Sequence, residues 1–142
     1  MQSTLENIIA KGDIDRLIAA IPYATLIGIK ATATTDDYLF TLAKKDDNLG
    51  NPFLPAIHGG AMGGFMETAG ILHLLTAIKT QQIPKVIDFS IDYLRPGRHQ
   101  DTFAQCQLIR QGRKIANVSI TAWQKSVNSP IATARAHYLI NN

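Results

Sequence analysis

Cysteine is almost absent from this 142-residue chain, in which Cys106 is the only one. A single thiol cannot form an internal disulfide, and it cannot build a zinc site alone. Cys106 lies within residues 103–108, where apolar and polar residues alternate. This alternation favours a buried structural thiol over a reactive one.

Long hydrophobic runs are also lacking. None approaches the roughly 20 apolar residues of a membrane span, and residues 1–10 do not carry the basic and apolar regions of a secretion signal. We therefore expect a soluble, cytoplasmic protein without a membrane partner. Apolar residues make up 46% of the chain and charged residues 18%, so a core can form and disorder is not expected. The length suits a single domain over residues 1–142.

The chain has only a small excess of positive over negative charge, and it has few aromatic side chains. The formal net charge is +3 and aromatic residues make up 7% of the chain. This charge is too small to indicate nucleic acid binding, and no aromatic residues interleave with a basic stripe. We therefore expect no nucleic acid partner. The mildly basic balance suits a small polyanionic ligand.

The pattern of apolar and turn residues predicts helix, strand, strand, long helix and four strands. Residues 3–6 match a capping box that opens a short N-terminal helix. Asp13 can cap a second piece over residues 14–21, which Pro22 is expected to end. A loop is predicted over residues 44–57. The long helix is predicted over residues 58–79, and the strands over residues 25–33, 38–42, 86–94, 102–110, 113–125 and 131–140.

Short connections between strands predict an antiparallel sheet, and one long helix must cover one face of it. The predicted fold class is therefore α+β. It consists of an antiparallel sheet of about six strands wrapped around one central helix, with a short N-terminal helix. This arrangement is the hotdog architecture.

The predicted long helix is rich in glycine, with five between positions 59 and 70. Each costs about 1 kcal/mol relative to alanine in a helix interior. The helical repeat predicts one face made of Gly60, Gly63, Gly64, Glu67, Gly70, Ile71 and Leu74. The opposite face, which we expect to pack on the sheet, carries Met62, Phe65, Ala69, Leu72 and Thr76.

Two interpretations of the glycine face remain open. The glycines can serve close helix–helix packing, with Glu67 as an ordinary surface charge. Alternatively, the bare backbone admits a ligand or another helix next to a working carboxylate. The second is favoured, because a tightly packed helix does not readily accommodate a lone glutamate.

The start of this helix supplies a second functional group. His58-Gly59-Gly60 follows a loop, and the first amides of a helix lack internal partners and carry partial positive charge. Such an amide can polarise a carbonyl and stabilise an oxyanion. Gly59 and Glu67 are about 12 Å apart along one helix, so one carbonyl carbon cannot contact both. Two antiparallel copies could bring them together, which predicts an obligate dimer with two shared sites.

The chain resembles a known family at these residues. His-Gly-Gly with an acid nine residues after the histidine, and Tyr-Leu-Arg-Pro-Gly at 93–97, are similar to hotdog acyl-CoA thioesterases of the PaaI and 4-hydroxybenzoyl-CoA type. Residues 21–29 match that family's N-terminal region, so the resemblance covers nearly the whole chain. It implies hydrolysis of an acyl-CoA thioester by a homodimer or homotetramer. It also implies no metal or other cofactor, with coenzyme A entering only as part of the substrate.

The resemblance assigns roles to particular residues. Glu67 is the carboxylate that attacks the thioester or activates water, and the Gly59 amide binds the carbonyl oxygen. The family often has Asn or Gln six residues before the histidine. That position is Pro52 here, and Asn51, one residue away, is the candidate for the role. His58 is a catalytic candidate as a base, although a structural role orienting the loop is favoured.

Substrate-binding candidates lie on the same helix and beyond the following strand. Gly60, Gly63, Phe65, Met66, Thr68 and Ile71 are candidates for contact with the acyl-CoA. Arg95 and Arg98 are candidates for its phosphates, ahead of Arg110, Arg113 and Lys114 around a later turn. Among the other histidines, His73 is expected in the core, and His99 and His137 have no visible partner.

Two other functions remain possible from the sequence. A hydratase or dehydratase on the same fold would use a histidine and an acid near the helix start, which His58 keeps open. The other is a non-catalytic acyl-CoA-binding protein. The acid at the ninth position after the histidine and the doubled glycine favour hydrolysis.

Overall fold

The computed structural model describes residues 2–51 and 53–140 of the chain. Its helices are α1 (Gln2–Lys11), α2 (Ile14–Ala19), α3 (Pro22–Ile27) and α4 (Gly59–Ala77), with a short 3-10 turn, η1 (Asp46–Asn48). Its strands are β1 (Ile29–Ala33), β2 (Tyr38–Leu42), β3 (Leu49–Asn51), β4 (Ala56–Ile57), β5 (Lys85–Tyr93), β6 (Thr102–Gln111), β7 (Ile115–Trp123) and β8 (Ala132–Leu139). The side chain of Ser3, in the predicted capping box, lies outside the described part, as does Pro52.

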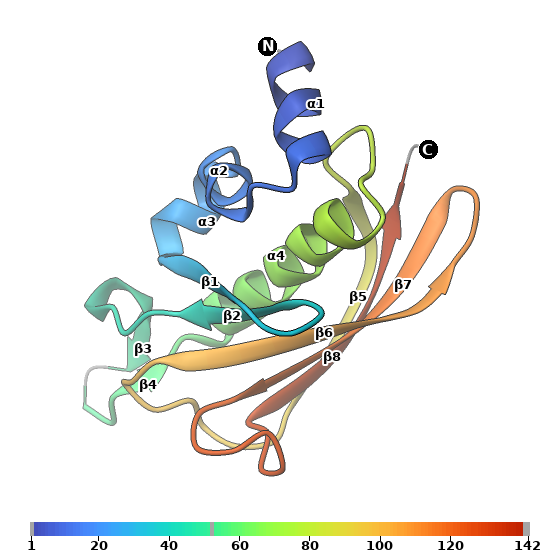
Figure 1. Ribbon diagram of the computed structural model, residues 1–142. Helices are drawn as coiled ribbons and strands as arrows, with labels where there is room; N and C mark the ends of the chain where they lie inside the picture. The colour runs from blue at the N-terminus through green and yellow to red at the C-terminus, as the bar shows by residue number, and fades with distance from the viewer. Residues whose placement is uncertain (1, 52, 141–142) are drawn as a thin grey trace.

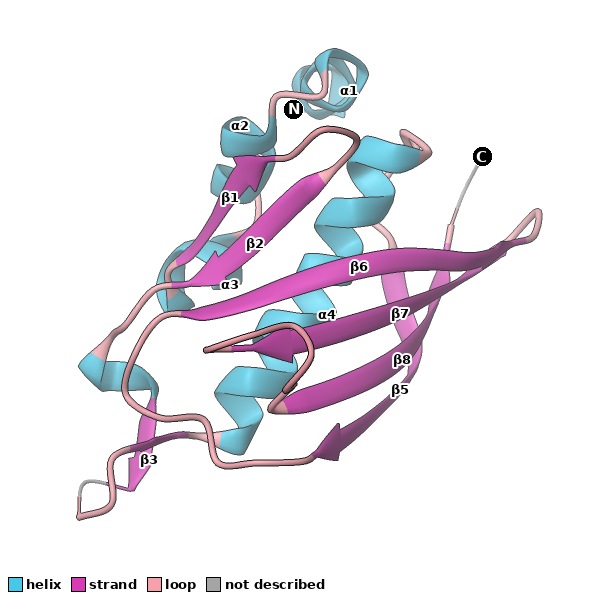
Figure 2. Ribbon diagram, turned by 60° about the horizontal axis from the view of Figure 1, so that its bottom comes forward, coloured by secondary structure: helices cyan, strands magenta, loops and turns pink. Residues whose placement is uncertain are grey.

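Six strands form one antiparallel sheet in the order β1-β2-β6-β7-β8-β5. The sheet curves around α4, as Figure 1 shows. The turned view in Figure 2 shows α4 running along one face of the sheet behind β6, β7 and β8. The predicted hotdog architecture is therefore confirmed, including its α+β class and its single long helix.

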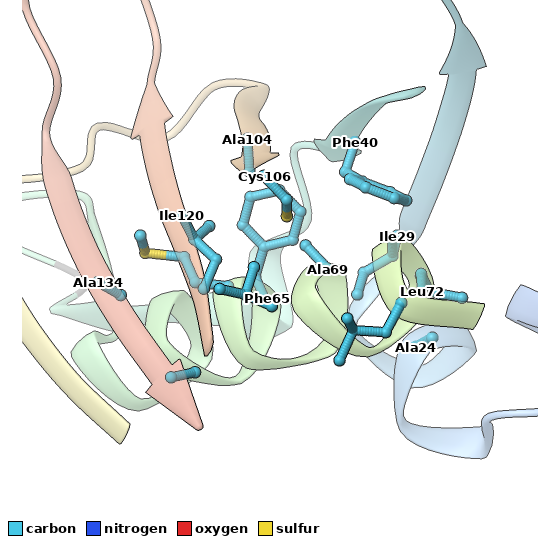
Figure 3. Packing of buried hydrophobic residues seen from close by; sticks show 14 of the residues in the cluster. Ala24, Ile29, Phe40, Phe65, Ala69, Leu72, Ala104, Cys106, Ile120 and Ala134 are labelled. Atoms are coloured by element: carbon cyan, nitrogen blue, oxygen red, sulfur yellow. The ribbon is translucent and has the colours of Figure 1, made fainter. Parts of the chain in front are cut away.

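The core lies between α4 and the sheet. Alternate residues of β7 and β8 are buried, as the period of two in a half-buried strand requires. On α4 four residues of the predicted apolar stripe are buried (Met62, Phe65, Ala69 and Leu72), and Thr76 is half-buried. Figure 3 shows Phe65 directed toward Cys106 and Ile120 of the sheet. Cys106 is only 6% exposed, which confirms a structural thiol, and burial raises its pKa.

Leu74 corrects the predicted division of α4 into two faces. It is fully buried, although the helical repeat places it on the glycine face. The reason is that α2 and α3 pack against α4 on the side away from the sheet (Figure 1). A helix covered on both sides is apolar around most of its circumference, so one stripe does not describe it.

The segment before β1 also differs from the prediction. Residues 25–27 end α3 instead of beginning a strand, and Pro22 begins that helix instead of ending the previous one. Proline suits the first helical position because its φ angle is preset and its missing N–H is not needed there. Gly28 then ends α3 in the left-handed region at φ 87°, which glycine adopts without strain.

The remaining histidines are placed by the fold. His73 is buried with Nδ1 3.4 Å from Asp37 Oδ1, which confirms its expected core position. His99 and His137 do have neighbours, which the sequence did not reveal: His99 Nε2 lies 3.1 Å from an Asp46 carboxylate oxygen, and His137 lies 3.4 Å from Asp88. Both acids come from distant segments, so local sequence could not indicate them. No helix in the described part is long and apolar enough to span a membrane.

Candidate active site

His58 forms the N-cap of α4. Its backbone amide donates to the Asn48 carbonyl at 2.8 Å, and its Nδ1 accepts a hydrogen bond from the Gly60 amide at 2.9 Å. The ring also lies against Gly50, where an added Cβ would approach the His58 Cα within 2.9 Å. The structure therefore supports the structural role of His58 that the sequence favoured, because one ring nitrogen is used to cap the helix.

The Gly59 amide has a different environment. Gly60 donates to His58, and the Met62 amide donates to the His58 carbonyl at 3.0 Å. The Gly59 amide has no hydrogen-bond partner within residues 2–51 and 53–140. Gly59 lines a pocket of about 320 Å³ together with Ala56, Ile57, Met62, Tyr93, Leu94, Arg95, Pro96, Gly97, Ile131 and Ala132. A free donor at a helix N-terminus beside a pocket is suited to a carbonyl oxygen.

Tyr93 joins this site, although sequence reasoning did not assign it a role. Its hydroxyl donates to the Gly59 carbonyl at 2.6 Å, and its side chain lines the same pocket. The Gly59–Gly60 peptide is thus held at both ends, by Tyr93 at the oxygen and by His58 at the nitrogen. The only signal in the sequence was the position of Tyr93 at the start of the Tyr-Leu-Arg-Pro-Gly motif.

Glu67 lies half-buried two turns further along α4. Burial raises the pKa of its carboxyl above the usual range for glutamate, because the charged form loses hydration. Its carboxylate makes no hydrogen bond or ion pair with any described residue. Because α4 is one continuous helix from Gly59 to Ala77, the predicted separation of about 12 Å between Gly59 and Glu67 stands.

The glycine face of α4 is only partly open, because other side chains of the same chain cover two of its glycines. An added Cβ at Gly64 would overlap the hydroxyl of Tyr23 from α3, and one at Gly70 would overlap the hydroxyl of Tyr138 from β8. Close packing, the interpretation that the sequence disfavoured, therefore explains these two glycines. Gly60 is exposed and Gly63 is half-buried, so the face remains open mainly near the helix start.

The side chains predicted to contact the acyl group differ in how deeply they are buried. Phe65 and Met66 are fully buried and Thr68 is 4% exposed, so all three face the interior of the chain. None of them lines the pocket at Gly59. Ile71 is half-buried one turn after Glu67. Proximity in sequence placed Phe65, Met66 and Thr68 in the candidate site, whereas the helix repeat turns them toward the core.

The predicted phosphate-binding arginines are brought together. Arg95 and Arg98 line a second pocket of about 380 Å³, which also contains Lys125 and Gln124. Arg95 lines both pockets and donates to the Pro130 carbonyl. Lys125 was missed by sequence reasoning because it comes from the segment after β7. The second basic cluster, Arg110, Arg113 and Lys114, surrounds the β6–β7 turn and lines neither pocket.

Asn51 is held by its own turn. Its side-chain oxygen accepts hydrogen bonds from the Phe53 amide at 2.9 Å and the Leu54 amide at 3.2 Å. Only the side-chain amide nitrogen of Asn51 remains available, and it can only donate. In its predicted role Asn51 could therefore donate a hydrogen bond to water or to the thioester, but could not accept one. No group of three or more His, Cys, Asp or Glu side chains that could hold a metal ion occurs among the residues that the structure describes.

Comparisons with known proteins identify the family and the fold of the chain. A family model described as the thioesterase superfamily matches residues 54–131. A solved protein of Chromobacterium violaceum is 38% identical, with 100% of this chain and 98% of that chain covered and a TM-score of 0.79. No curated protein matches the chain.

Two further solved structures show the same fold at lower identity. A thioesterase from Haemophilus influenzae is 23% identical over 84% of this chain and 82% of its own, with a TM-score of 0.74. A phenylacetic acid degradation-related protein from Ralstonia eutropha JMP134 is 20% identical over 89% of this chain and 98% of its own, also with a TM-score of 0.74. Because the matched family model spans more than half of the chain and includes the helix with Gly59 and Glu67, this chain belongs to the thioesterase superfamily, and its membership supports thioesterase activity in general.

Proposed function

We propose that the protein hydrolyses acyl-CoA thioesters at a site shared by two subunits. One observation carries the proposal: a single helix bears an amide that lines a pocket and a half-buried carboxylate, and neither group has a partner among the residues that the structure describes. These are the two groups that thioester hydrolysis needs, an oxyanion donor and a nucleophile or base.

In the proposed reaction the thioester carbonyl oxygen accepts a hydrogen bond from the Gly59 amide. Glu67 then either attacks the carbonyl carbon or takes a proton from the attacking water. The carbon–sulfur bond breaks, and the coenzyme A thiolate leaves and takes up a proton. If Glu67 attacks directly, the acyl group forms an anhydride with Glu67, and water then hydrolyses this bond to release the carboxylic acid and restore the carboxylate. If Glu67 acts as a base, the attacking water supplies the hydroxyl of the acid directly. This scheme uses no metal or redox cofactor, and coenzyme A is present only as part of the substrate.

The separation of the two groups requires a second copy of the chain. Apolar side chains lie exposed on both sides of the N-terminal half of α4: Tyr23 and Leu26 on α3 are 41% and 65% exposed, and Tyr93 and Leu94 are 55% and 51% exposed. The edge strand β5 ends at Tyr93 in the same region, and on its outer side it pairs with no other strand of the described residues. Such surfaces are typical of an interface that another subunit covers. In the proposed dimer the Gly59 amide of one subunit and Glu67 of the other act on the same thioester.

The basic pocket next to the Gly59 pocket suits the phosphates of coenzyme A. Arg95, Arg98 and Lys125 provide three positive charges there, and Arg95 links the two pockets. Guanidinium groups match phosphate oxygens well, so this arrangement favours a nucleotide-bearing thioester over a small free thioester. A hydratase on this fold is disfavoured, because the Nδ1 atom of His58 is used in capping α4.

A thiol-release screen tests the proposed function. The wild-type protein should release free thiol from at least one member of a panel of short, medium, long and aryl acyl-CoAs. Loss of enoyl absorbance without thiol release would indicate the hydratase instead. Tight acyl-CoA binding without turnover across the panel would indicate a non-catalytic binding protein.

Mixing two inactive variants tests whether the site is shared. Glu67→Gln removes the carboxylate and Gly59→Pro removes the amide donor. In a mixed dimer, one site combines the intact Gly59 of one subunit with the intact Glu67 of the other, and the second site has neither. Random reassociation of equal amounts should therefore restore about a quarter of wild-type thiol release. Mixtures that stay as inactive as the separate variants, despite mixed dimers shown by native mass spectrometry, would contradict the shared site.

A further inference from the structure

The buried tyrosine of β8 contacts the backbone at the proposed catalytic acid. We propose that Tyr138 is a positioning residue that fixes the helix turn carrying Glu67, through a hydroxyl that only a glycine at position 70 admits. This inference rests on the proposed function, and it adds to that function a residue outside the matched motifs of α4.

The contact is well defined. Tyr138 is 0% exposed, and its hydroxyl donates to the Glu67 carbonyl at 2.7 Å. That carbonyl also accepts the Ile71 amide in a regular α-helix, so the tyrosine adds a second bond to the same oxygen. Burial raises the pKa of Tyr138, with Cys106 and then Glu67 as smaller causes, so the hydroxyl stays protonated and remains a donor at neutral pH.

Gly70 makes this contact possible. An added Cβ at position 70 would overlap the Tyr138 hydroxyl, with the ring carbon Cζ only 2.8 Å away. A glycine inside a helix costs about 1 kcal/mol relative to alanine, and burying a hydroxyl is also unfavourable unless it is bonded. Glycine at position 70 therefore leaves the room that the end of the Tyr138 ring occupies, and the bond to the Glu67 carbonyl satisfies the buried hydroxyl.

The surrounding helix needs such a constraint. Glu67 lies between Gly64 and Gly70, and glycine leaves the backbone freer to move than any other residue does. The carboxylate itself is held by no described side chain. The bond from β8 ties this turn to the sheet, and a displacement of about 1 Å of a catalytic group is enough to lower turnover strongly.

The test is a double-mutant cycle on thiol release. Tyr138→Phe removes only the hydroxyl and should lower kcat about tenfold while KM stays unchanged, because the proposed phosphate contacts lie elsewhere. In the Glu67→Gln background the same substitution should have no further effect, because the tyrosine acts through the carboxylate. Tyr38→Phe is the matched control, since the Tyr38 hydroxyl has no hydrogen-bond partner in the described part of the chain, and it should leave kcat unchanged.

Gly70→Ala approaches the same contact from the helix side. Its Cβ should push the hydroxyl away from the Glu67 carbonyl, so it should reproduce the loss in kcat even if Tyr138→Phe folds poorly. If the wild type is active and either variant folds and keeps a normal kcat, the inference is overturned, whereas the proposed function still stands. The inference would also be overturned if Tyr138→Phe lowered kcat equally in the wild-type and Glu67→Gln backgrounds, because this would show a general structural effect. A wild type that releases no thiol from any acyl-CoA would overturn both.

Discussion

Replacing Glu67 with glutamine should lower the turnover of the best acyl-CoA substrate by about 10²–10⁴-fold. Glutamine has nearly the same shape as glutamate, but it can neither attack a thioester nor accept a proton from water. The oxyanion donor at Gly59 and the pocket around it are unchanged in this variant. The fall should therefore appear in kcat, measured as thiol release at saturating substrate, while gel filtration shows the same oligomeric state as for the wild type.

Glu6→Gln is the matched control for this prediction, since Glu6 is the only other glutamate in the chain and lies exposed on α1. It should have wild-type turnover. If Glu67→Gln kept nearly normal turnover while folded and dimeric, the role of the carboxylate would have to be abandoned.

The same carboxylate should determine the acid side of the pH profile. In the proposed reaction thiol release requires ionised Glu67, so the rate should fall as the pH is lowered through its pKa. Burial holds that pKa above the ordinary value of a glutamate, so the fall should begin at a higher pH than an exposed glutamate would give. The residual rate of Glu67→Gln should lack this fall. A profile identical in the two proteins would show that another group titrates.

Replacing Gly59 with proline should lower kcat by about 10²–10³-fold, the range expected for loss of one oxyanion donor. Proline has no N–H, and a ring methylene occupies the position of the lost hydrogen. The fold should tolerate the change, because proline is favoured at the first position of a helix. His58 already has ψ 133°, the extended conformation that a residue before proline adopts.

Gly59→Ala separates the lost donor from the lost glycine. It keeps the amide, and its Cβ would lie 3.3 Å from the hydroxyl oxygen of Tyr93, a half-exposed side chain that can adjust. We expect this variant to keep most of the wild-type turnover. Thermal unfolding of both variants checks that α4 is intact. Equal losses in the alanine and proline variants would show that the requirement at position 59 is space and not the amide.

Much of the proposed site could be predicted from local sequence. The distance between Gly59 and Glu67 depends only on their separation along one helix, because an α-helix rises by about 1.5 Å per residue. The helix itself was predictable from its apolar spacing and from its start after a loop. The proposal of a second subunit at the site rests on the same distance. The hotdog arrangement was predictable because short turns between alternating strands leave one long helix to cover the sheet.

The tertiary structure decided what each glycine of α4 contacts. Tyr138 reaches the Glu67 carbonyl across 71 residues of chain, and Tyr93 reaches the Gly59 carbonyl across 34. The helical repeat shows which residues share a face, but it contains no information on which strand or helix covers that face. This is why the sequence could not show that Tyr23 and Tyr138 occupy two positions of the glycine face.

The basic pocket was decided in the same way. Arg95 and Arg98 were candidates from sequence, but Lys125 joins them only because the segment after β7 folds back beside them. The sequence by itself determined the helix, its acid and its free amide, because these depend on interactions between residues a few positions apart. The tyrosines that hold that helix and the third cation of the pocket depend on how the sheet packs against α4, which only the assembled chain specifies.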